Sequence, residues 1–143
     1  MTLVRTAVAA TAAVAIAVSF VTGCTSTPKH PDSEEMYIKA SALTKLSAAV
    51  ESTVRYKNPP ADLDERELLM LATRHDPVLL ENFRGYKVRV LRQERHSVVL
   101  VCDASGTHAL LEDSGCTGRM DRERWMGKPE PCEFSIDTRA ACQ

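Results

Sequence analysis

The sequence predicts an α+β domain in which two or three N-terminal helices pack on a small antiparallel three-stranded meander, followed by a disulfide-stapled C-terminal segment. Three observations support this fold class. Apolar residues recur at helical spacing over residues 32–57, they alternate with polar residues from Tyr86 onward, and four cysteines lie in the last third of the chain. With 143 residues, the chain is long enough for one small domain.

The first 24 residues have the features of an export signal. Arg5 is the only charged side chain before Lys29, and the apolar run at residues 6–20 is shorter than the roughly 20 residues of a spanning helix. The tetrapeptide Val21-Thr22-Gly23-Cys24 then resembles the lipobox of bacterial lipoproteins. The resemblance implies that residues 1–23 are a signal peptide and that Cys24 becomes the first mature residue.

In that family the cysteine carries a diacylglyceryl group on sulfur and usually a further acyl chain, such as palmitate, on its amine. Several acyl chains together give stable membrane anchoring. Thr25 stands where Asp often marks inner-membrane retention, so the resemblance implies an outer-membrane protein facing the periplasm. Residues 24–31 are expected to be a lipidated tether, because Ser, Thr, Pro, Lys and His cannot build a core. Residues 32–143 would form the single periplasmic domain.

The first predicted helix covers residues 32–57. Asp32 followed by Glu35 is an N-cap pattern, and Asn58-Pro59-Pro60 ends the helix. One face carries the apolar residues expected in the core, which are Met36, Tyr37, Ala40, Leu43, Leu46, Val50 and Val54.

Two shorter helices are expected next. Asp62 with Glu65 repeats the cap pattern before an apolar helix that extends to about His75. Asp76-Pro77 then opens another helical turn, which Gly85 ends. The expected apolar face of this turn consists of Val78, Leu79, Leu80 and Phe83.

From Tyr86 onward, apolar residues recur at every second position. Residues 86–91 predict a strand with one polar face, residues 98–101 a central strand with two apolar faces, and residues 108–111 a third strand. Beyond Glu112 the chain is mostly polar, with Trp125 and Phe134 as its main packing anchors. Such a segment can hardly fold alone, so cysteines are expected to hold it against the sheet.

Once Cys24 is assigned to lipid, an even number of cysteines remains: Cys102, Cys116, Cys132 and Cys142. In a small exported domain these are expected to form two disulfides. Three connectivities are possible, and short loops favour Cys102–Cys116 with Cys132–Cys142. A metal site formed by Cys102, Cys116 and His108, with His96 as a further ligand, is the less favoured interpretation because no CxxC pair occurs. No metal or cofactor is therefore expected.

Five cations stand against Glu94 alone in one basic run, whose members are Arg84, Lys87, Arg89, Arg92 and Arg95. Strand geometry places Lys87 and Arg89 on one side of the strand. The run is either a solvated face paired with the acidic residues of positions 62–67, or a docking patch for an acidic partner, phospholipid headgroups or an anionic envelope polymer.

No catalytic set is apparent. Ser105 and Ser114 lack a nucleophile-elbow pattern, His75, His96 and His108 are isolated, and Glu112-Asp113 would point to opposite faces of a strand. The net charge of −1 and the export signal both argue against nucleic-acid binding.

The sequence thus favours a non-enzymatic lipid-anchored envelope lipoprotein, attached to the membrane through Cys24. It would bind an envelope protein as an accessory in secretion, conjugation, appendage or envelope assembly. The alternative is an inhibitor or ligand-binding module directed at a cell-wall hydrolase or an anionic envelope component. In this connection "SVVLVCDASG" looks like the strand and turn around a cysteine in membrane-bound lipoprotein lysozyme inhibitors, although their Ser-Gly-Ser-rich inhibitory loop has no counterpart here.

Overall fold

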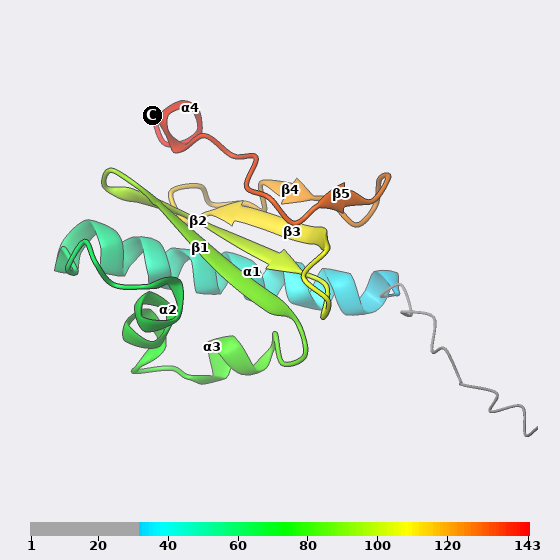
Figure 1. Cartoon of the computed structure of the whole chain (residues 1–143), viewed down its shortest axis with the longest axis horizontal. Coiled ribbons are helices and arrows are strands. Elements are labelled where there is room, and N and C mark those ends of the chain that lie inside the picture. The colour runs from blue at the N-terminus through cyan, green and yellow to red at the C-terminus, as the bar shows by residue number, and fades with distance from the viewer. Residues whose placement is uncertain (1–31) are drawn as a thin grey trace, which may run out of the picture. The chain divides into compact units, whose positions relative to one another are not determined.

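The computed structural model describes residues 32–143, which are arranged in three layers (Figure 1). Helices cover one face of an antiparallel sheet, and the C-terminal segment covers the other face. The predicted α+β class is therefore confirmed. The signal peptide, the lipobox with Cys24 and the tether of residues 24–31 lie outside the described residues.

Helix α1 (Ser33–Ser52) supplies most of the helical side of the core. As predicted, the Asp32 side chain caps it by accepting a hydrogen bond from the Glu35 amide at 2.8 Å. The helix continues as a π-helical turn, η1 (Thr53–Lys57), and ends at Asn58 in the left-handed conformation. The expected core positions are buried with one exception. Tyr37 was predicted in the core, but it is 55% exposed, and its ring lies edge to face against Trp125.

Helix α2 (Glu65–Thr73) begins two residues later than the sequence pattern suggested. The N-cap is Asp64, whose carboxylate accepts from the Glu67 amide, while Glu67 accepts from the Asp64 amide in a complete capping box. Asp62 was therefore the wrong cap. Glu65, its expected partner, reaches the sheet and pairs with Arg89 at 3.2 Å.

A single helical turn, α3 (Val78–Glu81), follows Pro77. Phe83 is 2% exposed and enters the core as predicted, but Val78 is 63% exposed. A helix of four residues presents only a narrow face to the core, and Leu79 and Leu80 occupy that face. Gly85 has φ 85°, a conformation in which glycine avoids the strain of a side chain, and it leads the chain into the sheet.

The sheet is built around the predicted meander of β1 (Lys87–Gln93), β2 (His96–Cys102) and β3 (His108–Ser114). Only Glu94 and Arg95 connect β1 to β2, with Glu94 at φ 56°, so this turn is shorter than expected. Two further strands that the sequence did not predict, β4 (Arg122–Glu123) and β5 (Glu130–Pro131), both pair with β3. Both are two residues long and carry no alternating pattern.

An irregularity at Val101/Cys102 in the pairing of β2 with β3 decides which side chains face the helices. Leu110 has no partner in the register, so Leu110 and Leu111 both join the core beneath α1. Ala109 lies on the opposite face with Leu100 and Cys102, where Phe134 packs against them.

The C-terminal layer is attached to the sheet by the buried carboxylate of Glu112. It accepts hydrogen bonds from the Ser135 amide at 2.7 Å, the Ser135 hydroxyl at 2.6 Å and the Ile136 amide at 3.1 Å. The guanidinium of Arg124, also buried, donates to it at 3.3 Å. Trp125 in the main core and Phe134 on the outer face are the packing anchors that the sequence predicted.

All four C-terminal cysteines form disulfides, but the favoured pairing was wrong. The bonds join Cys102 to Cys132 and Cys116 to Cys142, with Cα separations of 5.8 and 5.5 Å. The pairing of β5 with the start of β3 brings Cys132 beside Cys102. Helix α4 (Thr138–Ala141) then delivers Cys142 to Cys116, just beyond the end of β3. Sheet pairing, not loop length, thus determines the connectivity.

Candidate functional site

An open groove of about 570 Å³ lies between the N-terminal half of α1 and the segment around α3. We call it the α1–α3 groove, and its lining residues are Tyr37, Ile38, Ser41, Ala42, Lys45, Asp76, Val78, Leu79 and Asn82. Three of the side chains at its rim are large, apolar and more than half exposed: Tyr37, Ile38 at 61% and Val78. Exposed apolar side chains that gather around a groove are typical of an interaction site.

The two walls of the groove are fixed to one another by polar contacts. Lys39 of α1 donates to the carbonyl of Asn82 at 2.8 Å and lies 4.5 Å from the centroid of the Tyr86 ring. The Tyr86 hydroxyl in turn donates to Glu35 at 2.7 Å. Burial and this hydrogen bond to Glu35 raise the pKa of Tyr86, so the phenol keeps its proton and the bond is maintained. The groove is therefore preformed.

The apolar surface extends beyond the groove on the side of Tyr37. Its ring meets that of Trp125 edge to face, with the centroids 6.1 Å apart and the planes at 87°. Met126, which follows Trp125 in the chain, is 61% exposed. Tyr37 therefore connects the groove to Trp125, and the sequence did not indicate this because the periodicity assigned Tyr37 to the core.

Most cations of the basic run have a hydrogen-bond or ion-pair partner in this chain. Arg84 pairs with Glu81, Lys87 donates to the carbonyl of Ser105 at 2.9 Å, and Arg92 donates to the carbonyls of Pro60 and Pro59 at 2.7 and 3.1 Å.

Arg89 is the most engaged of the five cations. Besides its ion pair with Glu65, its guanidinium lies 5.1 Å from the centroid of the Phe134 ring. Arg95 is exposed in the turn between β1 and β2. Lys87 and Arg89 do point away from the buried Val90 of the main core, as the strand pattern predicted. The carboxylates of Glu81 and Glu65 offset part of the positive charge of the run, whereas the carbonyl partners of Lys87 and Arg92 do not.

A second polar region lies between α1 and the sheet. Ser47 of α1 donates to the buried carboxylate of Asp113, which also accepts from the Asp121 amide at 3.1 Å. Burial raises the pKa of Asp113 to about 6, although the hydrogen bond from Ser47 opposes this shift, and the charge of Asp121 adds to it. As expected from strand geometry, Asp113 and Glu112 point to opposite faces of the sheet.

One turn further along α1, Glu51 joins the helix to the start of β2. Its carboxylate accepts from the Ser97 amide at 2.8 Å and from the Ser97 hydroxyl at 3.0 Å, and it lies 2.6 Å from Nδ1 of His96. Gly115 lies against this part of α1 so closely that any side chain there would meet the carbonyl of Ser47 and the Cβ of Glu51.

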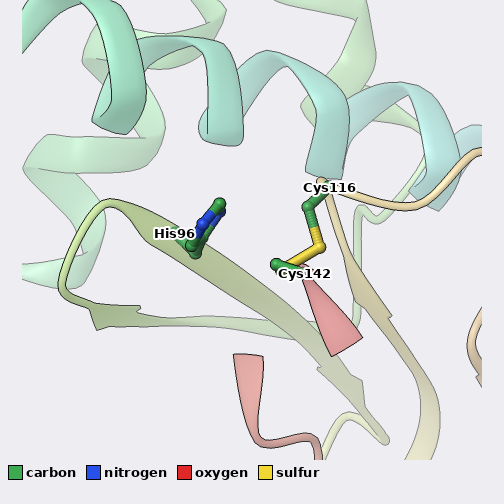
Figure 2. A group of neighbouring side chains, drawn as sticks. All are labelled: His96, Cys116 and Cys142. Atoms are coloured by element: carbon green, nitrogen blue, oxygen red, sulfur yellow. A yellow bond between two sulfur atoms is a disulfide. The ribbon is translucent and has the colours of Figure 1, made fainter. Parts of the chain in front are cut away.

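His96 also lies beside the Cys116–Cys142 disulfide, beneath α1 (Figure 2). A ring nitrogen of His96 and the two sulfur atoms are all within 4.8 Å of one another, and all three residues are partly exposed. The metal interpretation of the sequence grouped His96 with Cys116 but also included Cys102 and His108 and omitted Cys142. The strand register explains why His96 and Cys116 meet. Val98 of β2 pairs with Ser114 of β3, His96 comes two residues before Val98, and Cys116 comes two residues after Ser114, so both lie at the same end of this antiparallel pair.

The remaining polar candidates have structural partners. Ser114 is buried and donates to Asp121 at 2.5 Å, and Ser105 donates to Asp103 at 2.8 Å in the turn before β3. Burial raises the pKa of Asp103, but hydrogen bonds from Ser105, Thr107 and His108 outweigh this effect and lower the pKa below its ordinary value. This carboxylate therefore organises the turn. The ring of His75 accepts from its neighbour Arg74 at 2.7 Å.

Comparison with known protein families, with curated proteins and with solved structures finds no match to this chain. Among the helices of residues 32–143, none is both long enough and apolar enough to cross a bilayer. Function must therefore be inferred from the residues and their geometry.

Proposed function

We propose that this chain is a lipid-anchored envelope lipoprotein that binds another protein as a non-enzymatic accessory in secretion, conjugation, appendage or envelope assembly. The α1–α3 groove is the observation that supports binding most directly. Its exposed rim of Tyr37, Ile38 and Val78 would remain in contact with water unless a partner covers it.

The proposed occupant of the groove is a short amphipathic segment of a partner protein. Apolar side chains of that segment would fill the groove, as in other helix-in-groove and peptide-in-groove complexes. Lys45 and Asp76, which lie among the lining residues, would pair with charges of opposite sign on the segment and fix its direction. Tyr37 would contribute a large contact area at a small entropic cost, as tyrosines commonly do at interfaces.

The position of the groove along the chain suits an anchored protein. Tyr37 and Ile38 lie in the first two turns of α1, and only seven residues separate Cys24 from Asp32. A stretch of that length reaches no more than about 25–30 Å. With Cys24 in the membrane, the groove would therefore act close to the bilayer surface, on partners that are themselves membrane-associated.

The anchor is tested by Cys24→Ala. We expect the variant to keep residues 1–23 and to lack the acyl groups, both read by mass spectrometry, and to be retained in the inner membrane by its uncleaved apolar run. Density-gradient separation of the wild-type protein would then distinguish the outer from the inner membrane. Normal processing and unchanged fractionation of Cys24→Ala would refute the lipoprotein assignment.

The groove is tested by Ile38→Asp, with Met70→Asp on α2 as the matched control. Both side chains are exposed to a similar degree, 61% and 58%, but only Ile38 lines the groove. A photo-crosslinker placed at Ser41 should capture a partner in intact cells. We expect Ile38→Asp to abolish the crosslink and Met70→Asp to leave it intact. Equal crosslinking in the two variants would exclude the groove as the binding site.

The alternative function is an inhibitor or ligand-binding module directed at a cell-wall hydrolase or an anionic envelope component, and its anionic-ligand form depended on the basic run. Arg84 and Arg89 pair with carboxylates of this chain, which reduces the net charge that the run offers an anionic ligand, whereas Lys87 and Arg92 bond backbone carbonyls that do not neutralise their charge. The groove, which is apolar at its rim, is better suited to a protein segment.

A further inference from the structure

The cluster of His96, Cys116 and Cys142 has a chemistry that the proposed binding function does not use. We propose that reduction of the Cys116–Cys142 disulfide converts this cluster into a three-ligand site for a thiophilic divalent cation such as Zn²⁺. The site would use the two cysteine thiolates and Nε2 of His96. It stands independently of the lipid anchor and of the α1–α3 groove.

The geometry of the donor atoms already approaches that of a tetrahedral metal site. The His96 nitrogen and both sulfurs lie within 4.8 Å of one another. Zinc bonds of about 2.3 Å to sulfur and 2.0–2.1 Å to nitrogen place tetrahedral ligand atoms roughly 3.4–3.8 Å apart. The sulfurs must separate after reduction and the imidazole must approach them by about 1 Å to reach these separations. Water would take the fourth position.

Glu51 prepares His96 for this role. A carboxylate only accepts hydrogen bonds, so its contact with Nδ1 at 2.6 Å places the ring proton on Nδ1 and leaves the lone pair on Nε2. A carboxylate bonded to the remote nitrogen of a histidine is the usual second partner in zinc sites, where it orients the ring and raises its basicity. Ser97 holds Glu51 in place through two further hydrogen bonds.

The two disulfides differ in their access to a reductant. In the Cys102–Cys132 bond only Cys132 is partly exposed, because Cys102 is fully buried in the outer cluster with Phe134, whereas Cys116 and Cys142 are both partly exposed. A thiolate must reach a sulfur atom to exchange with it. The Cys116–Cys142 bond should therefore open first, while Cys102–Cys132 and the Glu112 contacts keep the C-terminal layer on the sheet.

The reaction balances with a dithiol reductant. Its two thiols form a new disulfide, the Cys116–Cys142 bond breaks, and the two electrons and two protons pass to the cysteines. Metal binding then displaces those two protons, because thiolates and not thiols are the ligands. Two thiolates and a neutral imidazole leave the bound divalent cation without net charge.

The test uses the full chain purified in detergent. A limited amount of dithiol reductant is added until mass spectrometry finds a single open disulfide, and the reductant is then removed. Titration with Co²⁺ alone should give sulfur-to-cobalt charge-transfer absorption with the visible bands of tetrahedral cobalt at one equivalent, and Zn²⁺ should displace the cobalt. The oxidised protein should give no such bands.

His96→Asn should weaken Co²⁺ binding to the reduced protein at least tenfold. His108→Asn is the matched control, since His108 is also bonded to a carboxylate, Asp103 at 3.1 Å, but is not part of the cluster, and it should leave the affinity unchanged. Equal affinities in the two variants would overturn the proposal. So would opening of Cys102–Cys132 before Cys116–Cys142, or loss of the circular-dichroism spectrum when Cys116–Cys142 alone is reduced.

Discussion

A single methyl group added at Gly115 would collide with the backbone of α1. The Cβ of an alanine there would meet the carbonyl of Ser47 and the Cβ of Glu51, neither of which can rotate away. We therefore expect Gly115→Ala to lower the free energy of unfolding by about 1–3 kcal/mol, the usual cost of overpacking. Gly118→Ala is the control, because its added Cβ has no neighbour within 4 Å. Urea denaturation of both variants measures the difference.

Asp113 gives stability a pH dependence of unusual sign for a carboxylate. Its pKa is about 6 in the folded protein, against the ordinary value of 3.8 that applies to the unfolded chain. The native state therefore holds the proton more tightly, and its contribution to stability is fully present below about pH 3.8 and is lost as the pH rises through about 6.

We expect this group to lower the free energy of unfolding by about 2–3 kcal/mol between pH 4 and pH 7. Asp113→Asn cannot ionise, so the difference in stability between the variant and the wild type should change by that amount over the same interval. Thermal denaturation at several pH values measures it, and a constant difference would show that folding does not raise the pKa of Asp113.

Among the elements, α2 offers a test of where a helix begins. Asp64 forms the capping box with Glu67, whereas Asp62 is exposed outside the helix. Asp64→Ala should lower the free energy of unfolding by about 1 kcal/mol. Asp62→Ala should change it by less than about 0.5 kcal/mol, as is usual at exposed positions. A larger loss of stability for Asp62→Ala than for Asp64→Ala would show that Asp62 is the N-cap, as the sequence pattern suggested.

The elements that sequence reasoning found are those with a sustained period. The spacing of Met36, Ala40 and Leu43 predicts α1 because a helix of that length repeats its face several times, and the alternation through Val88 and Val90 predicts β1 in the same way. Strands β4 and β5 are too short to show any period, and they form only because β3 offers them an edge. The bulge that turns Leu110 into the core is likewise a property of the pairing.

The candidate sites depended still more on tertiary structure. The sequence named His96, Cys116 and Cys142 individually but could not group them, because their proximity follows from strand register and from the path of the C-terminal layer. The groove was missed because a helical pattern shows which residues can face inward, not which part of that face the sheet covers. Tyr37 fits the apolar pattern of α1, yet it is 55% exposed, whereas Met36 is fully buried.

At the scale of the whole molecule, the two disulfides should make similar loop-entropy contributions to stability. Their sequence separations are 30 and 26 residues, and loop entropy gives about 3.5–4 kcal/mol for each. The paired variant Cys102→Ala/Cys132→Ala should lose more than this, because Cys102 is fully buried and its truncation also leaves a cavity. Cys116→Ala/Cys142→Ala should lose no more than the entropic share. Equal losses, measured by denaturation, would contradict the difference in burial.

The connectivity of these bonds has a consequence for oxidative folding. The two bonds interleave, since each joins a cysteine to the second one after it along the chain. A chain that is oxidised in the order in which it emerges would first join Cys102 to Cys116, which is a non-native pair. Native pairing therefore requires either that oxidation waits until β5 has docked on β3, or that an isomerase reshuffles the first bond. The efficiency of maturation in the cell should accordingly depend on folding before oxidation or on disulfide isomerisation, and not on oxidation alone.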